Sequence, residues 1–150
     1  MTTYLLDTNV LISLVDPRRP QHSIAQETVE ALRRQGHELA VCFQNCAEFW
    51  NVATRPISTN GLGFSTSTAI EELSRIERAF NLVPDSLAAY PIWRQLVVNY
   101  GVSGVQVHDA RLVAVMIANH ISHMLTFNVA DFVRYSRRGI IAVDSSGMHR

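Results

Sequence analysis

The chain has 150 residues, the length of one ordinary domain, and its apolar fraction of 47% excludes an intrinsically disordered protein. Thirteen basic and thirteen acidic residues give a formal net charge of zero, which argues against a general electrostatic grip on nucleic acid. Charged residues make up only 17% of the chain, and this low share suggests that a partner or a second copy covers part of the surface.

The cysteines and the N-terminal segment indicate a cytoplasmic protein. Cys42 and Cys46 lie four residues apart without a second Cys or His at zinc-finger spacing, and two lone thiols suit a reducing compartment. The N-terminus lacks a basic region, and Asp7 and Asn9 interrupt its apolar stretch, so it does not resemble a signal peptide. Because no run approaches about 20 apolar residues, we expect no membrane span.

The first half of the chain is predicted to alternate short apolar strands with amphipathic helices. In chain order the pattern predicts a strand at 4–6, a helix ending before Pro17, a helix over 23–35 stopped by Gly36, a strand over 39–43 and a helix from Gln44 or Asn45 to Ala53. Residues 57–63, rich in Gly, Ser, Thr and Asn, are predicted to form a loop.

The second half continues the alternation. Helices are predicted over 67–80, 91–100 and 108–120, with strands at 82–83, 123–127 and 140–143. Short apolar strands separated by helices indicate an α/β fold with a central parallel sheet covered on both faces. We find no repeat or low-complexity tract, and we expect a single domain over residues 1–150.

Polar side chains follow several of the predicted strands. In an open parallel sheet, ligands bind beyond the carboxyl ends of the strands. The polar residues expected at that edge are Asp7, Asn9, Glu48, Asp109, Thr126, Asn128 and Asp131. If the topology is right, several carboxylates therefore collect at one edge of the sheet.

Each of these acids also has a purely structural interpretation. Asp7, Asp109 and Asp131 could cap the helices that begin near them. Glu48 lies nearly opposite the apolar stripe of its helix and could simply face solvent. Asp109, however, shares the apolar face of its helix, where a carboxylate requires a partner or a metal because burying a lone charge is costly.

Taken together, four stretches of the sequence resemble a known family. They are Tyr4-Leu-Leu-Asp-Thr-Asn-Val-Leu11, Asn45-Cys-Ala-Glu-Phe-Trp-Asn-Val52, Val107-His-Asp-Ala-Arg-Leu-Val-Ala114 and Leu125-Thr-Phe-Asn-Val-Ala-Asp-Phe132. In this order they resemble the PIN-domain nucleases, and within them the VapC-type toxins of bacterial toxin–antitoxin pairs. The resemblance covers residues 4–132 and implies a three-layer α/β/α PIN fold.

The resemblance also implies roles for the polar residues. Asp7, Glu48 and Asp109 would be acidic metal-site residues, with Asn9 and Thr126 as supporting polar groups. Two residues are candidates for the fourth acidic position. The family often has Asp where this chain has Asn128, and Asp131 follows three residues later. Asp131 is the predicted outer-sphere or second-metal residue, and Asn128 the alternative neutral ligand. The implied cofactor is Mg²⁺, with Mn²⁺ an alternative; the implied partners are an RNA substrate, a small antitoxin and a second copy of the chain.

The chemistry agrees with these residue types. A hard divalent cation held by carboxylates polarises a phosphate and lowers the pKa of the attacking water. Without the cation, two carboxylates about 4 Å apart repel each other by roughly 4 kcal/mol at an effective dielectric near 20. We therefore expect raised pKa values in the metal-free protein.

Arginines are the candidate phosphate contacts, or alternatively the contacts for an acidic segment of a partner. These are Arg18, Arg19, Arg134, Arg137 and Arg138, and each could also be ordinary solvated surface. Two other functions remain open: a haloacid-dehalogenase-like phosphatase, and a PIN-like binding module without catalysis. The phosphatase would require a second Asp where the chain has Asn9.

Overall fold

The structure, a computed structural model that describes residues 1–147, is built around an all-parallel five-stranded sheet. The strands are β1 (Thr3–Leu6), β2 (Glu38–Val41), β3 (Asn81–Leu82), β4 (His123–Thr126) and β5 (Ile141–Asp144). Their order across the sheet is β3-β2-β1-β4-β5, and every neighbouring pair is parallel. The predicted central parallel sheet is confirmed.

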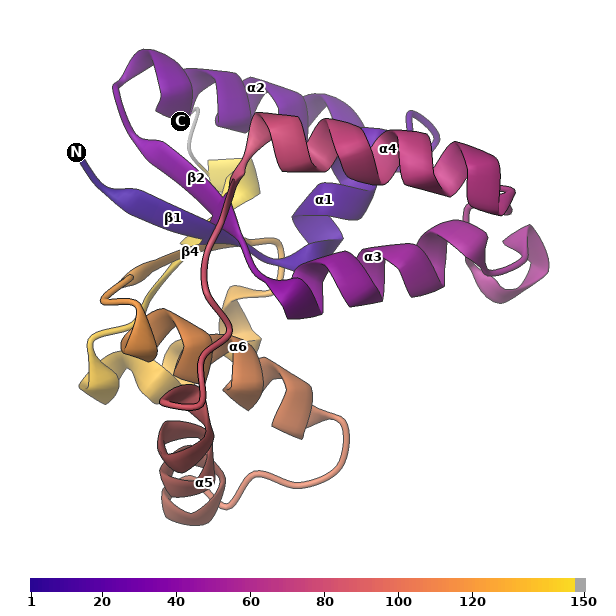
Figure 1. Ribbon diagram of the computed structural model, residues 1–150. Coiled ribbons are helices and arrows are strands. Elements are labelled where there is room, and N and C mark those ends of the chain that lie inside the picture. Colours follow the sequence, from indigo (N-terminus) through magenta and orange to yellow (C-terminus); the bar gives the residue numbers. More distant parts are fainter. Residues whose placement is uncertain (148–150) are drawn as a thin grey trace.

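Helices cover both faces of the sheet and give three layers (Figure 1). One face carries α1 (Thr8–Val15), α2 (His22–Arg34), α3 (Phe43–Thr54) and α4 (Thr66–Ala79); the other carries α5 (Ala89–Asn99) and α6 (Gln106–Ala118). Short 3-10 turns complete the chain: η1 (Ile57–Thr59), η2 (Val129–Asp131), η3 (Val133–Arg138) and η4 (Ser145–Gly147). In the described part of the chain, every helix is too short or too polar to cross a bilayer.

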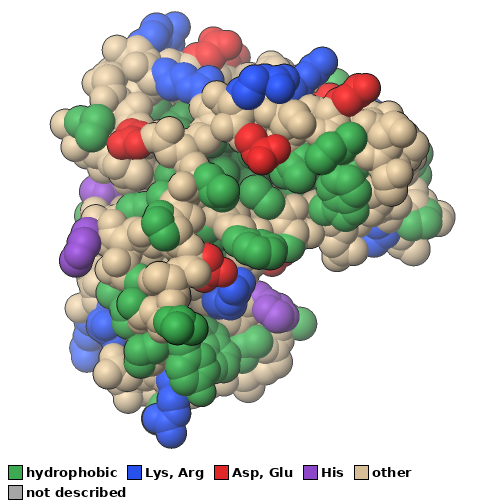
Figure 2. Space-filling view, viewed as in Figure 1, with side chains coloured by type: hydrophobic (Ala, Val, Ile, Leu, Met, Phe, Trp, Pro, Cys, Tyr) green, Lys and Arg blue, Asp and Glu red, His purple; other side chains and the backbone are tan. Residues whose placement is uncertain are grey.

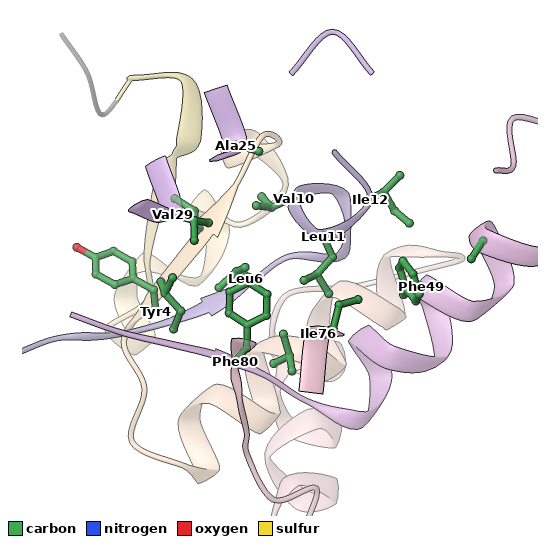
Figure 3. Close-up of a cluster of buried hydrophobic side chains, with 14 of the residues drawn as sticks. Tyr4, Leu6, Val10, Leu11, Ile12, Ala25, Val29, Phe49, Ile76 and Phe80 are labelled. Carbon is green, nitrogen blue, oxygen red and sulfur yellow. The ribbon is translucent and has the colours of Figure 1, made fainter. Parts of the chain in front are cut away.

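Two hydrophobic cores lie on opposite faces of the sheet, because successive side chains of a strand point in opposite directions. On β1, Tyr4 and Leu6 pack into the core beneath α1 to α4, whereas Leu5 packs against α5 and α6. Figure 3 shows the first core, with Leu6 and Leu11 among side chains from several helices. This arrangement confirms the three-layer α/β/α fold.

The start of α3 differs from the sequence-based prediction. Phe43 was expected to end a strand, but β2 stops at Val41 and Phe43 is the first residue of α3, with 64% of its surface exposed. The reason is local: Cys42 is the N-cap, and its backbone N–H donates to Asn45 Oδ1 at 2.9 Å. A side chain that accepts from the cap backbone is half of a capping box, so the helix begins before Asn45.

The start of α6 also differs from the prediction. The helix begins at Gln106, two residues before the expected His108, and its N-cap is Val105. Asp109 therefore lies inside the first turn and does not cap the helix. The two glycines of the preceding connector made this boundary difficult to place from the sequence.

The order of the strands creates a position suited to ligand binding. From β1 the chain moves to β2 and β3 on one side, while β4 and β5 lie on the other. The carboxyl ends of β1 and β4 therefore flank the point where the strand order reverses, which is where open α/β sheets bind ligands. Figure 2 shows the surface hollowed between the part formed by α3 and α4 and the part formed by α5 and α6.

Candidate functional site

Asp7 joins the carboxyl ends of β1 and β4. Its backbone N–H donates to the carbonyl of Leu125 at 2.9 Å, and its side chain is 9% exposed. Oδ1 accepts from the backbone N–H of Thr8 at 2.7 Å, so Asp7 caps α1; Oδ2 accepts from Thr126 Oγ1 at 2.8 Å. Thr126 in turn accepts from the backbone N–H of Asn128 at 2.9 Å. The structural and functional interpretations of Asp7 are thus compatible, since capping uses only one of its oxygens.

Glu48 faces this same edge from α3. Its Oε1 accepts from Thr8 Oγ1 at 2.9 Å, and the same hydroxyl accepts from Asn45 Nδ2 at 3.2 Å. The alternative in which Glu48 points only into solvent is therefore wrong. Thr8 and Asn45 were not among the predicted site residues. Two features of the sequence could have indicated them: Thr8 directly follows Asp7, and Asn45 lies at a capping position three residues before Glu48.

Asp109 and Asp131 complete a group of four acids that interact electrostatically. Burial is the main reason that the pKa of Asp109 is raised to about 6, and the charges of Asp7, Asp131 and Glu48 raise it further. Arg134 acts in the opposite direction on the same pKa. The four carboxylates come from four separate segments of the chain, following β1 and lying on α3, α6 and η2.

The pKa of Asp7 is also raised to about 6. Burial is again the largest cause, and it outweighs the hydrogen bonds from Thr126 and Thr8, which lower the pKa. The charges of Glu48 and Asp131 add to the increase. The pKa is therefore raised at Asp7 and Asp109 as expected, but burial is the main cause and repulsion from the other acids adds to it.

Asn9 and Asn128 lie together beside the acids. Both line a polar cavity of about 350 Å³ that Thr8 also lines. Asn9 Oδ1 is buried and has no hydrogen-bond partner within residues 1–147. A buried acceptor without a donor costs roughly 1–3 kcal/mol, so a donor for this oxygen would stabilise the site.

The predicted ligands match a hard divalent cation in type. Carboxylate and amide oxygens suit Mg²⁺, and the mutual repulsion of the acids favours a cation among them. As they stand, however, no three His, Cys, Asp or Glu side chains within residues 1–147 form a group that could hold a metal ion. The hydroxyls of Thr8 and Thr126 hold Glu48 and Asp7 instead. Binding an ion therefore requires the carboxylates to draw together.

Comparison with known proteins identifies the family. The family model of the PIN domain matches residues 4–137, and the chain belongs to the PIN domain family. Comparison with curated protein sequences gives no match.

Solved structures share the fold at low sequence identity. VapBC2 from Rickettsia felis bound to a promoter DNA fragment aligns with a TM-score of 0.69 and 14% identity, covering 95% of this chain and 98% of that chain. VapBC-1 from nontypeable Haemophilus influenzae gives 0.68 and 16%, covering 97% and 99%. FitAB bound to a DNA fragment gives 0.70 and 13%, covering 98% of each chain.

Proposed function

We propose that this PIN domain is a magnesium-dependent endoribonuclease and the toxin of a toxin–antitoxin pair. The observation that carries the proposal is the coupled group of Asp7, Glu48, Asp109 and Asp131 at the point where the strand order reverses, with two pKa values raised to about 6. Four acids at the switch point of the sheet suit a hydrolase that uses a divalent cation.

Each residue of the site would have a separate role in binding the metal or in orienting its ligands. Asp7, Glu48 and Asp109 would hold Mg²⁺ or Mn²⁺, and either Asp131 or Asn128 would complete the site. The bound ion would polarise the scissile phosphate and lower the pKa of the attacking water. Thr126 would keep Asp7 oriented through its hydroxyl, and the unpaired Oδ1 of Asn9 would accept from a water or a substrate hydroxyl.

Protons partly compensate the charge of the acids when no cation is present. With a pKa of about 6, Asp7 and Asp109 each carry a proton for part of the time near neutral pH. These protons must leave before both carboxylates can bind a cation. Affinity for the metal is therefore expected to rise as the pH rises through 6.

Two partner proposals rest on different observations. The neighbouring structures named above include VapBC assemblies, and a further neighbour from Klebsiella pneumoniae is described as a toxin–antitoxin complex, which supports a small antitoxin as partner. Exposed apolar side chains around α5 support a homodimer: these are Leu87, Tyr90, Val98 and Val105. Light scattering of the purified chain measures the dimer directly.

Cleavage of RNA tests the function. Purified chain should cut single-stranded RNA with Mg²⁺ and stop when EDTA is added, and Asp7→Asn or Asp109→Asn should lower the rate at least a hundredfold. Glu27→Gln, on the exposed side of α2, is the matched control and should leave the rate unchanged.

Two experimental results would contradict this proposal and indicate a different function. A covalent aspartyl-phosphate trapped on Asp7 would indicate a phosphatase that uses this residue as nucleophile. Calorimetry that detects no Mg²⁺ or Mn²⁺ binding would indicate a binding module without catalysis.

A further inference from the structure

Two arginine side chains meet at a single backbone carbonyl beside the acids. Arg19 Nη2 donates to the carbonyl oxygen of Asn60 at 3.0 Å, and Arg55 Nη2 donates to the same oxygen at 3.4 Å. Two cations sharing one neutral acceptor repel each other. The carbonyl oxygen is neutral and compensates neither charge, so each guanidinium depends on other groups for a counter-charge.

The nearby carboxylate of Asp16 pairs with Arg19 but not with Arg55. Asp16 accepts from Arg18 Nε at 3.0 Å and from Arg19 Nε at 3.2 Å, so two arginines already share it. Arg55 forms no ion pair within residues 1–147, and its Nε is buried without a hydrogen-bond partner. A buried donor of this kind is costly to leave unpaired, so Arg55 is the arginine of the two whose charge and Nε donor are not compensated by the described residues.

The backbone around the two arginines is firmly placed. The loop after η1 folds back on the end of α3, where Leu62 N–H donates to the carbonyl of Val52 and Gly63 N–H to that of Arg55, both at 2.9 Å. Gly61 has no room for a side chain, since a Cβ there would overlap the carbonyl of Arg55. Asn60 has a left-handed backbone with φ of 63°, a conformation that Asn tolerates. The carbonyl of Asn60, which accepts from both arginines, is thus part of a hydrogen-bonded and tightly packed turn.

These arginines line the polar cavity of about 350 Å³ described above, which we call the Arg19–Arg55 cavity. Its wall also contains Thr8, Asn9 and Asn128. Thr8 holds Glu48 through its hydroxyl, so the cavity directly adjoins the acidic group. A cationic cavity therefore lies next to the acids that are proposed to cleave RNA.

We propose that the Arg19–Arg55 cavity binds a backbone phosphate of the RNA, adjacent to the phosphate that is cleaved. The inference rests on the proposed ribonuclease function and adds a subsite to it. A chain with zero net charge and four clustered acids requires local cations to hold a polyanion. Guanidinium groups donate two parallel hydrogen bonds to phosphate oxygens, and Arg55 lines the cavity without an ion pair in the described part of the chain.

The salt dependence of RNA binding tests this subsite. Binding of a fluorescent single-stranded RNA is measured in the Asp109→Asn background, where cleavage should not interfere. Arg55→Gln is expected to weaken binding roughly tenfold and to reduce the slope of log affinity against log salt by about 0.7, the value for one phosphate contact with a single strand. Arg34→Gln is the matched control, because Arg34 ends α2 just before β2 begins, at the opposite edge of the sheet. An unchanged slope in Arg55→Gln overturns the proposal.

Inorganic phosphate provides a second measurement that does not depend on RNA. Titration should shift the Nε–H resonance of Arg55 and raise the melting temperature of the wild-type protein, and Arg55→Gln should lose the thermal effect. Arg55→Gln should melt no lower than wild type without phosphate, because it removes the repulsion from Arg19; this result also shows that the variant folds.

The outcomes separate this subsite from the proposed function. Cleavage by the wild type together with an unchanged salt slope in Arg55→Gln overturns the subsite alone. A response of Arg55 to phosphate without any effect on RNA binding overturns it too, and would assign the cavity to a free anion or an acidic segment of a partner protein. A chain that neither binds nor cleaves RNA contradicts the ribonuclease itself.

Discussion

Asp7 is the residue at which capping and electrostatics act in opposite directions. Its carboxylate caps α1, yet burial raises its pKa to about 6. A carboxyl group whose pKa is raised on folding stabilises the protein fully below its unfolded pKa, and this stability is lost as the pH rises through the folded pKa. For Asp7 the window runs from about pH 4 to above pH 6.

The raised pKa of Asp7 should make the free energy of unfolding depend on pH. Without metal, the free energy of unfolding should rise as the pH falls from 8 to 5. Asp7→Asn should be more stable than wild type at pH 8, by up to about 3 kcal/mol for a shift of two pKa units, because the amide keeps an acceptor for the cap and carries no charge. The two proteins should converge below about pH 4, the lower end of this window. Urea denaturation at pH 8 and below about pH 4 measures the difference in the free energy of unfolding.

Asp16 provides the matched control. Burial tends to raise its pKa, but hydrogen bonds and charge from Arg18 and Arg19 more than compensate, and the pKa is lowered. Asp16→Asn should therefore destabilise the protein at pH 8. If Asp7→Asn and Asp16→Asn lose stability alike, Asp7 acts only as a structural cap.

At the scale of single elements, the N-terminus of α3 connects the fold to the site. Asn45 is buried, accepts from the backbone N–H of Cys42 and donates to the hydroxyl that holds Glu48. Replacing a capping side chain by Ala costs about 0.5–2 kcal/mol.

We predict that Asn45→Ala lowers the free energy of unfolding by an amount near the upper end of that range, because the half-buried hydroxyl of Thr8 also loses a donor. Ser65→Ala, at the exposed N-cap of α4, removes a cap that contacts only its own first turn and should cost less. Chemical denaturation of both variants makes the comparison. Equal losses would show that the contact from Asn45 to Thr8 adds no stability.

The turn after η1 leaves no room for a side chain at Gly61. Gly61→Ala should cost more than 2 kcal/mol, since overpacking against backbone forces the turn to move. Gly101→Ala places its methyl group in open space at φ of 59°, so its cost should be about 1 kcal/mol, from the left-handed backbone alone. A tolerated Gly61→Ala would contradict the packed turn that holds the carbonyl of Asn60.

Sequence periodicity predicted the elements better than their boundaries. The helix predicted over 23–35 runs from His22 to Arg34, and Gly36, two residues further on, has a φ of 83° that explains the stop. Phe43 was placed wrongly, because an apolar residue after a buried strand fits the strand equally well. The local hydrogen bond from the N–H of the N-cap Cys42 to Asn45 decided the boundary.

At the scale of the whole molecule, the parallel sheet brings distant residues to one edge. The predicted strand ends put Asp7 and Thr126 at the same edge of the sheet, and in the structure the hydroxyl of Thr126 donates to Asp7. The Arg19–Arg55 cavity could not be predicted in the same way, since it depends on how one turn folds back on α3. Periodicity carries no information about such a contact.

Cation binding should stabilise the entire fold. Mg²⁺ is predicted to raise the melting temperature of the wild-type protein at pH 8 and to have a smaller effect at pH 5, where protons compete for Asp7 and Asp109. Asp7→Asn should lose most of the response. A wild-type melting temperature that is the same with Mg²⁺ and with EDTA would contradict a cation site.

The most direct measurement is the anomalous scattering of manganese in crystals of the protein grown with Mn²⁺. We predict one strong peak bonded to carboxylate oxygens of Asp7, Glu48 and Asp109, with these side chains drawn closer together than they lie in the structure described above. No peak at this edge of the sheet at saturating Mn²⁺, or a peak bonded to other residues alone, would contradict the assignment of these acids as a metal centre.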